Sequence, residues 1–403
     1  MRVLVAPAHI YLNTSYGSEV SWAYNIIWRL AKDYDVQVDA ICSKSDGLAL
    51  PSKVKVFEVG FDRGDFINRG LFYLECARAS KKLRENVDIV HHMFPFGFKG
   101  GFNLLAVLGY LKKKPFVIGP IQYPQEFEDI TDFMWVSKRK GASAQAIYSL
   151  ENVIVRLFSK PLNTLRKATL NEAEALVFDS RKTLELLKNL YPDTVKSKVL
   201  EIIPAGVETE TFKYSPPIKK EYFEVLSAGV LLKRKGIQYL IDAMPPVLRD
   251  IKNVRLRVVG DGPYKSELMQ MVKNRSLGNA VFFEGSVPRS KMVSYYRNCD
   301  IYVQPSLSET FPSTIREAMA VGRPVIATNT GFTTEHVIER NNGFIVSPGD
   351  AKTLASKILT LLGNESLRLK MGREGRKYAE ANFSWGKLVE KWHNVYEKIK
   401  PES

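Results

Sequence analysis

Short apolar runs that alternate with longer amphipathic segments constrain the fold of this chain more than any other feature. Most runs are continuously apolar rather than alternating with polar residues, which is typical of strands covered on both faces. The segments between them place apolar residues at helical spacing, as in Val20, Ala23, Tyr24 and Ile27. The sequence therefore predicts parallel sheets flanked by helices. The expected strands are 3–7, 36–42, 88–92, 116–119 and 175–179, then 223–229, 254–260, 281–285, 301–305, 324–328 and 343–347.

The alternation occurs twice, and 403 residues exceed what one hydrophobic core usually holds. We therefore expect the α/β class with two doubly wound domains. A proline- and lysine-rich run at 214–220 has no periodicity and predicts a boundary between domains of residues 1–215 and 221–384. A last segment, 385–400, has helical spacing but no strand left to follow.

Composition narrows the classes of function. The net charge of +15 predicts polyanionic partners, namely nucleic acid, an acidic membrane face or phosphorylated substrates. Nucleic acid is the weakest option, because the sequence has neither zinc-ligand spacing nor the aromatic pattern of RNA-binding sheets. No apolar run reaches the roughly 20 residues of a membrane span, and the first residues look like a strand rather than a secretory leader. Three cysteines in apolar segments (Cys42, Cys76 and Cys299) predict buried thiols in a cytoplasmic protein.

Loops at the expected carboxyl ends of strands carry the candidate site, because open parallel sheets bind ligands at that edge. Gly17 and Ser18 stand at the start of a helix, where backbone N–H groups can face an anion. Lys233, Arg234 and Lys235 lie in a glycine-bounded loop after a strand, as a phosphate clamp would. A simple turn and a solvated group of lysines are the alternatives for these two loops.

Residues 308–322, SETFPSTIREAMAVG, place two carboxylates around a proline. A helix is expected to begin near Pro312 or Ser313, because a proline restricts the residue before it and is favoured in the first turn. Glu309 then lies in the loop and Glu317 about one turn inside the helix, around N–H groups that attract an anion. The alternative is one capping and one solvated carboxylate. Two acids around an anion site suit a phosphate between hydroxyl-rich groups, which describes a nucleotide sugar.

The motifs together resemble the retaining glycosyltransferases of the GT-B fold called glycosyl transferases group 1. The resemblance is dense from residue 202 to 350 and thinner from 1 to 191. It implies two Rossmann-like domains facing a central cleft, with the last helix returning to the first domain. The matching segments are IPAGVETETF (203–212), GVLLKRKG (229–236), VVGDGP (258–263), VFFEGSVP (281–288), CDIYVQPS (299–306), the E-x7-E pair, EAMAVGRPVIAT (317–328) and NGFIVSPGD (342–350).

The resemblance also implies roles for individual residues. Glu309 would bind hydroxyls of the donor sugar, Glu317 would hold the ribose, and Lys235 would meet the diphosphate. The first domain would bind the acceptor, with Gly17, Ser18 and His91 near it, and the second would bind the donor. The stretch Phe311, Pro312, Ser313 and Thr314 would present backbone N–H groups to the sugar and phosphate. The remaining donor contacts would come from Arg234, Gly229, Gly260 and Val287.

Three positions depart from the family pattern. Val230 stands where an arginine is common, so the neighbouring Arg234 or Lys233 would have to replace that cation. Pro120 stands where many members have a histidine, which leaves His91 and His92 near that edge, either packed or in contact with an acceptor. The first glycine loop has a single glycine where two are usual.

The expected activity is a retaining transfer of a hexosyl group from a nucleotide-diphosphate sugar to a saccharide or lipid-linked hydroxyl. Stabilisation of the departing diphosphate by Lys235 and a helix N-terminus requires no cofactor and no metal. The only D-x-D sequence, Asp33 to Asp35, precedes a strand and is interpreted as a turn. An epimerase or phosphorylase of the same fold, and a non-catalytic basic scaffold, are the alternative functions.

Residues 137–167 are strongly basic, with apolar residues at helical spacing between the charges. A helix packed on the core with solvated lysines explains this pattern, and so does a helix lying on an anionic bilayer. The excess charge belongs to the domain that binds the acceptor in the resembled family. This favours a lipid-linked acceptor and a peripheral location on the inner face of the cell membrane.

Overall fold

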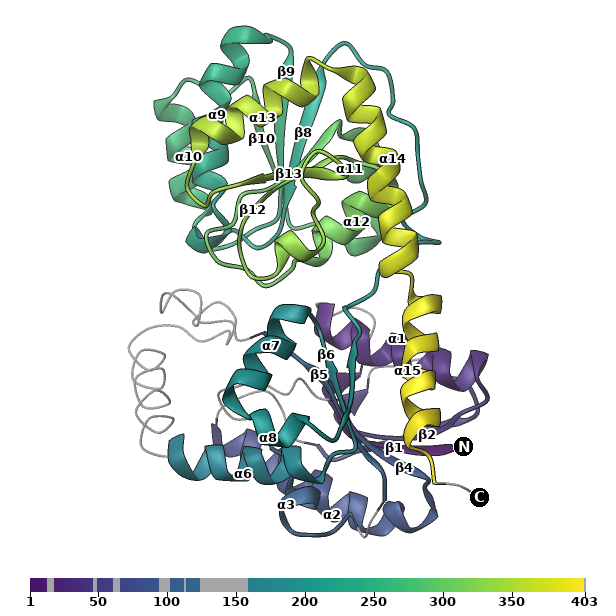
Figure 1. Ribbon diagram of the computed structural model, residues 1–403. Helices are drawn as coiled ribbons and strands as arrows, with labels where there is room; N and C mark the ends of the chain where they lie inside the picture. Colours follow the sequence, from purple (N-terminus) through teal and green to yellow (C-terminus); the bar gives the residue numbers. More distant parts are fainter. Residues whose placement is uncertain are drawn as a thin grey trace. The chain divides into compact units, whose positions relative to one another are not determined.

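The computed structural model describes residues 1–12, 18–45, 49–60, 66–93, 102–111, 114–123 and 159–401. These residues form two compact units (Figure 1). One unit holds the described residues up to 205 together with 385–401, and the other holds residues 206–384. The predicted α/β class is confirmed in both units, because each contains a parallel sheet with helices on both faces.

The first unit is built on a parallel sheet with the strand order β3-β2-β1-β4-β5-β6-β7. All strands expected in this half are present. The sequence analysis missed β3 and β7, which form the two edges of the sheet and are only partly buried. The strands are β1 (Arg2–Leu12), β2 (Gln37–Ser45), β3 (Val54–Glu58), β4 (Ile89–His92), β5 (Phe116–Ile121), β6 (Ala175–Phe178) and β7 (Val199–Ile202).

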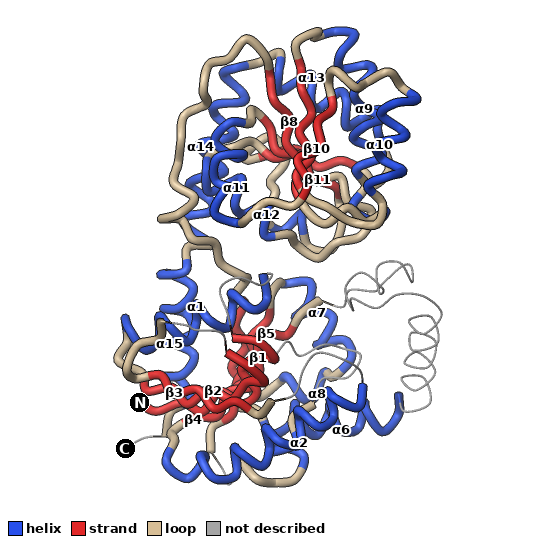
Figure 2. Tube along the Cα trace, turned by 180° about the vertical axis from the view of Figure 1, so that it is seen from behind, coloured by secondary structure: helices blue, strands red, loops and turns tan. Residues whose placement is uncertain are grey.

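Two helices from opposite ends of the chain share one face of this sheet (Figure 2). They are α1 (Ser18–Asp33) and α15 (Trp385–Ile399). In α15 a buried stripe at helical spacing, from Trp385 through Trp392 to Tyr396, packs into the core beside α1. The described helices of the other face are α2 (Phe66–Leu83), α3 (Leu104–Val107), α6 (Ser159–Glu172), α7 (Arg181–Leu190) and α8 (Pro192–Val195).

The second unit has a parallel sheet with the order β10-β9-β8-β11-β12-β13. Each strand corresponds to one expected from the sequence. Because the order reverses direction between β8 and β11, the loops after these two strands diverge and leave a site at their carboxyl ends. The strands are β8 (Phe223–Ala228), β9 (Val254–Val259), β10 (Val281–Gly285), β11 (Ile301–Gln304), β12 (Val325–Thr328) and β13 (Gly343–Val346).

Helices cover both faces of the second sheet (Figures 1 and 2). On one face lie α9 (Ile237–Asp250), α10 (Lys265–Asn274) and α13 (Ala351–Leu362). On the other lie α11 (Arg289–Asn298), α12 (Ser313–Val321) and α14 (Glu365–Asn382). Short 3-10 turns at Lys233–Lys235 and Thr333–Glu335 follow β8 and β12.

The run at 214–220, where the domain boundary was expected, lies inside the second unit. The fully buried Arg323 donates to the carbonyl of Ser215 at 2.8 Å. Arg376 likewise donates to the carbonyl of Phe212 at 2.8 Å. The N–H of Ser215 also donates to the carbonyl of Val321 in α12 at 3.2 Å. The segment is thus attached at the end of α12, and the residue Phe212 just before it is attached to α14.

Other sequence expectations have mixed outcomes. All three cysteines are free and buried, as predicted. Asp33 ends α1, and Asp35 lies in the turn before β2 with a φ of 57°, so the D-x-D sequence is a turn. In the ranges given above, no helix has both the length and the apolar character needed to cross a membrane. Most of the basic segment, residues 137–158, lies outside the described residues.

Candidate active site

A buried carboxylate and two cations meet at the carboxyl ends of β8 and β11. Lys235 forms an ion pair with Oε2 of Glu309, and the guanidinium of Arg234 lies 3.4 Å from the same oxygen. Arg234 also donates to the carbonyl of Ser308 at 3.2 Å. The Glu309 side chain is only 9% exposed, so the alternative of a solvated acid does not hold for it. The structure thus joins Lys235, Arg234 and Glu309, which the sequence identified separately.

The two cations determine the charge of Glu309. Burial alone would raise the pKa of this carboxyl, but Lys235 and then Arg234 lower it below its ordinary value. The group is therefore ionised at neutral pH and accepts hydrogen bonds without donating any. A partly buried carboxylate of this kind suits hydroxyl groups of a ligand.

Close backbone contacts fix the loops that carry these charges. Gly236 has a φ of 71°, and a Cβ at this position would overlap the carbonyl oxygen of Pro305. The N–H of Leu307 donates to the carbonyl of Arg234 at 2.7 Å. A Cβ on Gly331, whose φ is 53°, would likewise overlap the carbonyl oxygens of Thr310 and Glu309. Glycine is required at both positions because a side chain has neither the space nor the backbone freedom.

The helix α12 begins at Ser313, directly after Pro312, and is followed by Gly322, as the sequence predicts. The N-cap residue Pro312 makes no side-chain capping bond, and the N–H of Ile315 donates to the Pro312 carbonyl at 3.2 Å. The hydroxyl of Thr314 is engaged with Gln304 at 3.0 Å. The helix therefore offers backbone donors beside Glu309, where an anion is favoured.

The ring of Phe311 is buried beneath this loop, so only the backbone of the residue can face a ligand. The ring is 5% exposed and packs against His336, with 4.6 Å between ring centroids. Phe332 and Phe383 complete the cluster, each with its centroid 5.7 Å away. The ring thus anchors the loop, and the predicted donor contact through the main chain of Phe311 stays a prediction.

Glu317 projects from α12 toward α11 and is 4% exposed. Its Oε2 accepts a hydrogen bond of 2.9 Å from Tyr296, and its Oε1 lies 3.3 Å from the guanidinium of Arg289. Burial and the neighbouring Glu317 raise the pKa of Tyr296, so this hydroxyl keeps its proton and donates. Sequence reasoning missed both partners, because no spacing within residues 289–298 distinguishes them from ordinary helix residues.

Glycine turns lie at the same edge of the sheet. Gly229 and Gly260 have φ values of 151° and 137°, and a Cβ on Gly260 would overlap the carbonyl of Gly229. A Cβ on Gly229 would meet nothing within 4 Å, so the space beside it is open. Val287, partly buried, follows β10. Since β8, β9 and β10 are adjacent parallel strands, these residues share one edge with Lys235.

The candidate residues of the first unit have a different outcome. Gly17 lies outside the described residues, and Ser18 begins α1. The ring of His91 is fully buried, with Nδ1 2.7 Å from the Tyr396 hydroxyl and Nε2 2.9 Å from the Gly119 carbonyl. Burial lowers its pKa to about 3. Packing and two hydrogen bonds occupy the ring, so the structure favours the packing alternative for His91 over an acceptor contact.

His92 is buried too, with its Nδ1 3.0 Å from the side-chain nitrogen of Asn103. The packing alternative thus holds for both histidines. In the part of the chain that the structure describes, no three His, Cys, Asp or Glu side chains are grouped as metal ligands.

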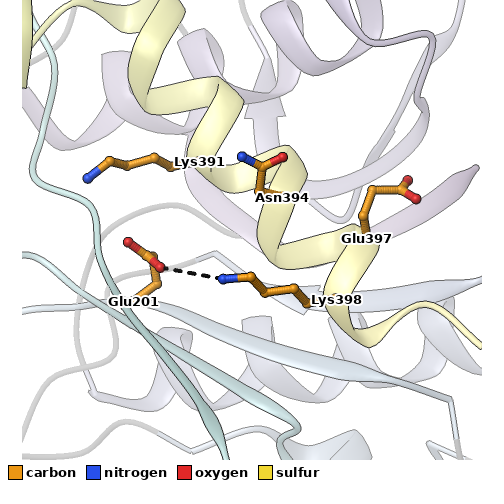
Figure 3. Close-up of a pocket in the computed structure, with 5 residues that line it drawn as sticks. All are labelled: Glu201, Lys391, Asn394, Glu397 and Lys398. Atoms are coloured by element: carbon orange, nitrogen blue, oxygen red, sulfur yellow. Dashed lines mark ion pairs between the residues drawn. The ribbon is translucent and has the colours of Figure 1, made fainter.

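A hollow of about 500 Å³ lies elsewhere, between β7 and α15 of the first unit (Figure 3). None of the residues predicted for the site lines it. Across it Lys398 and Glu201 form an ion pair of 4.0 Å, and the lysine is 56% exposed. Solvent screens such charges, so this hollow gives no sign of a ligand. Its lining residues are Glu201, Lys391, Asn394, Glu397 and Lys398.

Comparison with known proteins shows a family similarity in the second unit. Residues 208–378 match glycosyl transferases group 1, and this range nearly fills the second unit. The chain carries a glycosyl transferases group 1 domain. The E-x7-E pair, the Lys235 loop and α12 all lie inside the matched range.

Curated relatives align over about half of the chain. An uncharacterized glycosyltransferase of Methanocaldococcus jannaschii is 32% identical over 213 residues, which are 53% of this chain and 57% of the relative. A GDP-mannose-dependent alpha-(1-6)-phosphatidylinositol monomannoside mannosyltransferase of Mycolicibacterium smegmatis is 27% identical over 231 residues, 53% of this chain and 60% of the relative. The alignments thus span less than two thirds of these relatives.

The likeness of fold extends over the whole chain. Sucrose-phosphate synthase from Thermosynechococcus elongatus superimposes with a TM-score of 0.70, 20% identity, and coverage of 99% of this chain and 98% of that one. The predicted GT-B fold, with two Rossmann-like domains, is confirmed by this comparison together with the two parallel sheets.

Proposed function

We propose that the protein transfers a hexosyl group, with retention of configuration, from a nucleotide-diphosphate sugar to a hydroxyl of a saccharide or lipid-linked acceptor. The observation that carries the proposal is the cluster of Lys235, Arg234 and Glu309 beside the uncapped N-terminus of α12. Within one domain, this cluster combines cations and backbone N–H groups that can bind an anion with a carboxylate that can accept hydrogen bonds from hydroxyls. A glycosyl diphosphate has the matching groups.

The cations and the helix act on the leaving group. As the glycosidic bond breaks, negative charge grows on the diphosphate, and Lys235, Arg234 and the first N–H groups of α12 stabilise it. Arg234 takes the place of the arginine absent at Val230. Because Val230 is 38% exposed and apolar, it supplies no charge of its own.

Glu309 holds the sugar by accepting hydrogen bonds from its hydroxyls. The acceptor hydroxyl then attacks from the side of the leaving group, and a diphosphate oxygen takes its proton. This course retains the anomeric configuration and requires neither a metal nor a protein nucleophile. Binding of the diphosphate also competes with Glu309 for Lys235, so the ion pair of the free protein is a resting state.

Glu317 is proposed to hold the ribose of the donor. Its carboxylate lies on α12, about one turn after the N-terminus of the helix. One oxygen accepts a hydrogen bond from Tyr296, and the other faces the partly exposed Arg289. Gly229, Gly260 and Val287 would border the nucleotide with backbone groups.

The acceptor is proposed to be carried by a lipid and bound by the first domain. The net charge of +15 suits an anionic membrane surface, and the relative from Mycolicibacterium smegmatis is by its name a mannosyltransferase for a phosphatidylinositol mannoside. A cytoplasmic protein, peripheral on the inner face of the cell membrane, fits both observations.

Donor hydrolysis tests the proposal. The purified protein is incubated with UDP-, GDP- and ADP-linked hexoses, and the release of free nucleoside diphosphate is followed, with and without EDTA. We expect slow release from one nucleotide class, unaffected by EDTA and strongly reduced in Lys235→Ala. The freed sugar should first appear as the donor's own anomer. An epimerised nucleotide sugar, or no turnover of any donor, would support the alternative functions.

A further inference from the structure

We infer that Tyr296 is a positioning residue that fixes the carboxylate of Glu317 for the ribose of the donor. The inference rests on the proposed function, since it assigns a role within the proposed nucleotide site. Tyr296 lies on α11, which packs beside α12 (Figure 1). Its hydroxyl donates to Oε2 of Glu317 at 2.9 Å, and both residues are buried.

Packing of the ring and a hydrogen bond to the backbone of Tyr296 hold its hydroxyl in one position within the second unit. Its ring is fully buried between the rings of Phe212 and Tyr302, with centroid separations of 5.9 and 5.7 Å in edge-to-face geometry. The carbonyl of Tyr296 accepts a bond of 2.8 Å from Arg323. Both the ring and its backbone are therefore held from several directions.

Glu317 needs such a partner because its own rotamer does not fix the carboxylate plane. The terminal torsion of a glutamate is broad, so the two oxygens exchange places easily unless a hydrogen bond selects one orientation. Tyr296 binds the inner oxygen and leaves Oε1 toward Arg289, whose side chain is 46% exposed. Vicinal hydroxyls of a ribose would thus meet a carboxylate already oriented for them.

Nucleotide binding tests the role. Dissociation constants are measured for wild type, Tyr296→Phe and Tyr295→Phe. The two ligands are the nucleoside diphosphate that the hydrolysis assay selects and its 2′,3′-dideoxy analogue. We expect Tyr296→Phe to weaken the ribonucleotide about tenfold, as for the loss of one hydrogen bond, and to leave the dideoxy analogue unchanged. Tyr295→Phe is the matched control, because that hydroxyl donates to Glu284 instead.

A double-mutant cycle separates positioning from general destabilisation. In a Glu317→Gln background, Tyr296→Phe should have a much smaller effect on ribonucleotide binding than in wild type. Equal weakening of both nucleotides by Tyr296→Phe would overturn the inference while leaving the proposed function intact. Failure of the wild-type protein to bind any nucleoside diphosphate would overturn both.

A second variant keeps the test available if Tyr296→Phe does not fold. Incorporation of 3-fluorotyrosine at position 296 keeps the ring and hydroxyl but changes the acidity of the donor. The ratio of the two dissociation constants should then shift from its wild-type value. An unchanged ratio, with ribose hydroxyls still contributing to wild-type binding, would contradict the role.

Discussion

The ion pair between Glu309 and Lys235 connects the electrostatics of the site to the stability of its domain. The folded-state pKa of Glu309 lies below its ordinary value, because the cations outweigh the effect of burial. A carboxyl with a lowered pKa stabilises the folded state above its ordinary pKa, and this stabilisation is lost as the pH falls through the lower, folded value.

The first prediction follows from that sign. Glu309→Gln should lower the free energy of unfolding at pH 7, and the difference from wild type should shrink as the pH falls below about 4.5, the ordinary pKa of a glutamate. Urea unfolding from pH 7 to pH 3 measures both curves. If the difference in unfolding free energy between wild type and Glu309→Gln stayed constant from pH 7 to pH 3, ionisation of Glu309 would not contribute to the stability of the fold.

The second prediction concerns Glu317. If it accepts two ribose hydroxyls, Glu317→Ala removes charge-assisted hydrogen bonds of about 1.5 to 3 kcal/mol each, so donor binding should weaken by roughly two to four orders of magnitude. Calorimetric titration with the donor nucleotide measures the change, and circular dichroism checks folding. An unaltered dissociation constant in the folded variant would refute the assignment.

The residues of the site were only partly predictable from the sequence. Glu309, Glu317 and Lys235 stand in loops or helix starts whose motifs are local, so a single sequence is enough to propose them as site residues. Their contacts depend on the order of strands, because Lys235 reaches Glu309 only where β8 and β11 are neighbours. The hydrogen bond from Tyr296 and the burial of His91 depend on tertiary contacts, which the spacing of residues in the sequence does not reveal.

At the scale of elements, the strands covered on both faces were the predictable ones. Their continuous apolar runs require burial on two sides, and only helices over a parallel sheet provide it. The edge strands β3 and β7 were not predicted from the sequence, because each is half exposed and carries charged residues such as Lys55 and Glu201. The start of α12 was predictable because a proline defines it.

The third prediction tests the turn that carries Lys235. Gly236→Ala places a Cβ against the carbonyl of Pro305 in a left-handed backbone conformation, so the 233–235 turn must move. We expect a loss of about 1 to 3 kcal/mol in unfolding free energy together with a loss of donor turnover. Gly278→Ala is the control, because a Cβ there meets nothing within 4 Å. Equal stability and activity in the two variants would contradict a fixed turn.

At the scale of the whole molecule, the end of the chain is part of the first unit. The helix α15 contributes Trp385, Trp392 and Tyr396 to a core that also contains β1 and α1. Tyr396 lies 2.7 Å from His91, so residues 305 positions apart meet inside one sheet-helix layer. In the described part of the chain, the connections near residues 206 and 384 therefore lead into well-packed structure.

The distribution of charge leads to the last prediction. The basic segment 137–167 belongs by sequence to the first domain, and residues 138–140 alone supply three consecutive cations. Each basic residue near an anionic bilayer contributes about 1 kcal/mol of attraction. Salt screens this attraction within a Debye length of about 3 to 10 Å, depending on its concentration.

We therefore expect the protein to co-sediment with anionic but not with neutral liposomes, and about 0.5 M salt to reduce the bound fraction, because screening weakens attraction between surface charges. Replacing residues 138–140 by glutamates should reduce binding strongly. The control variant replaces the exposed Lys252, Lys273 and Lys370 of the second unit and changes the net charge equally. If both variants lose binding to the same extent, net charge rather than the segment directs attachment. Equal partitioning of the wild type onto both liposome types, or onto neither, would make a water-soluble acceptor the better proposal.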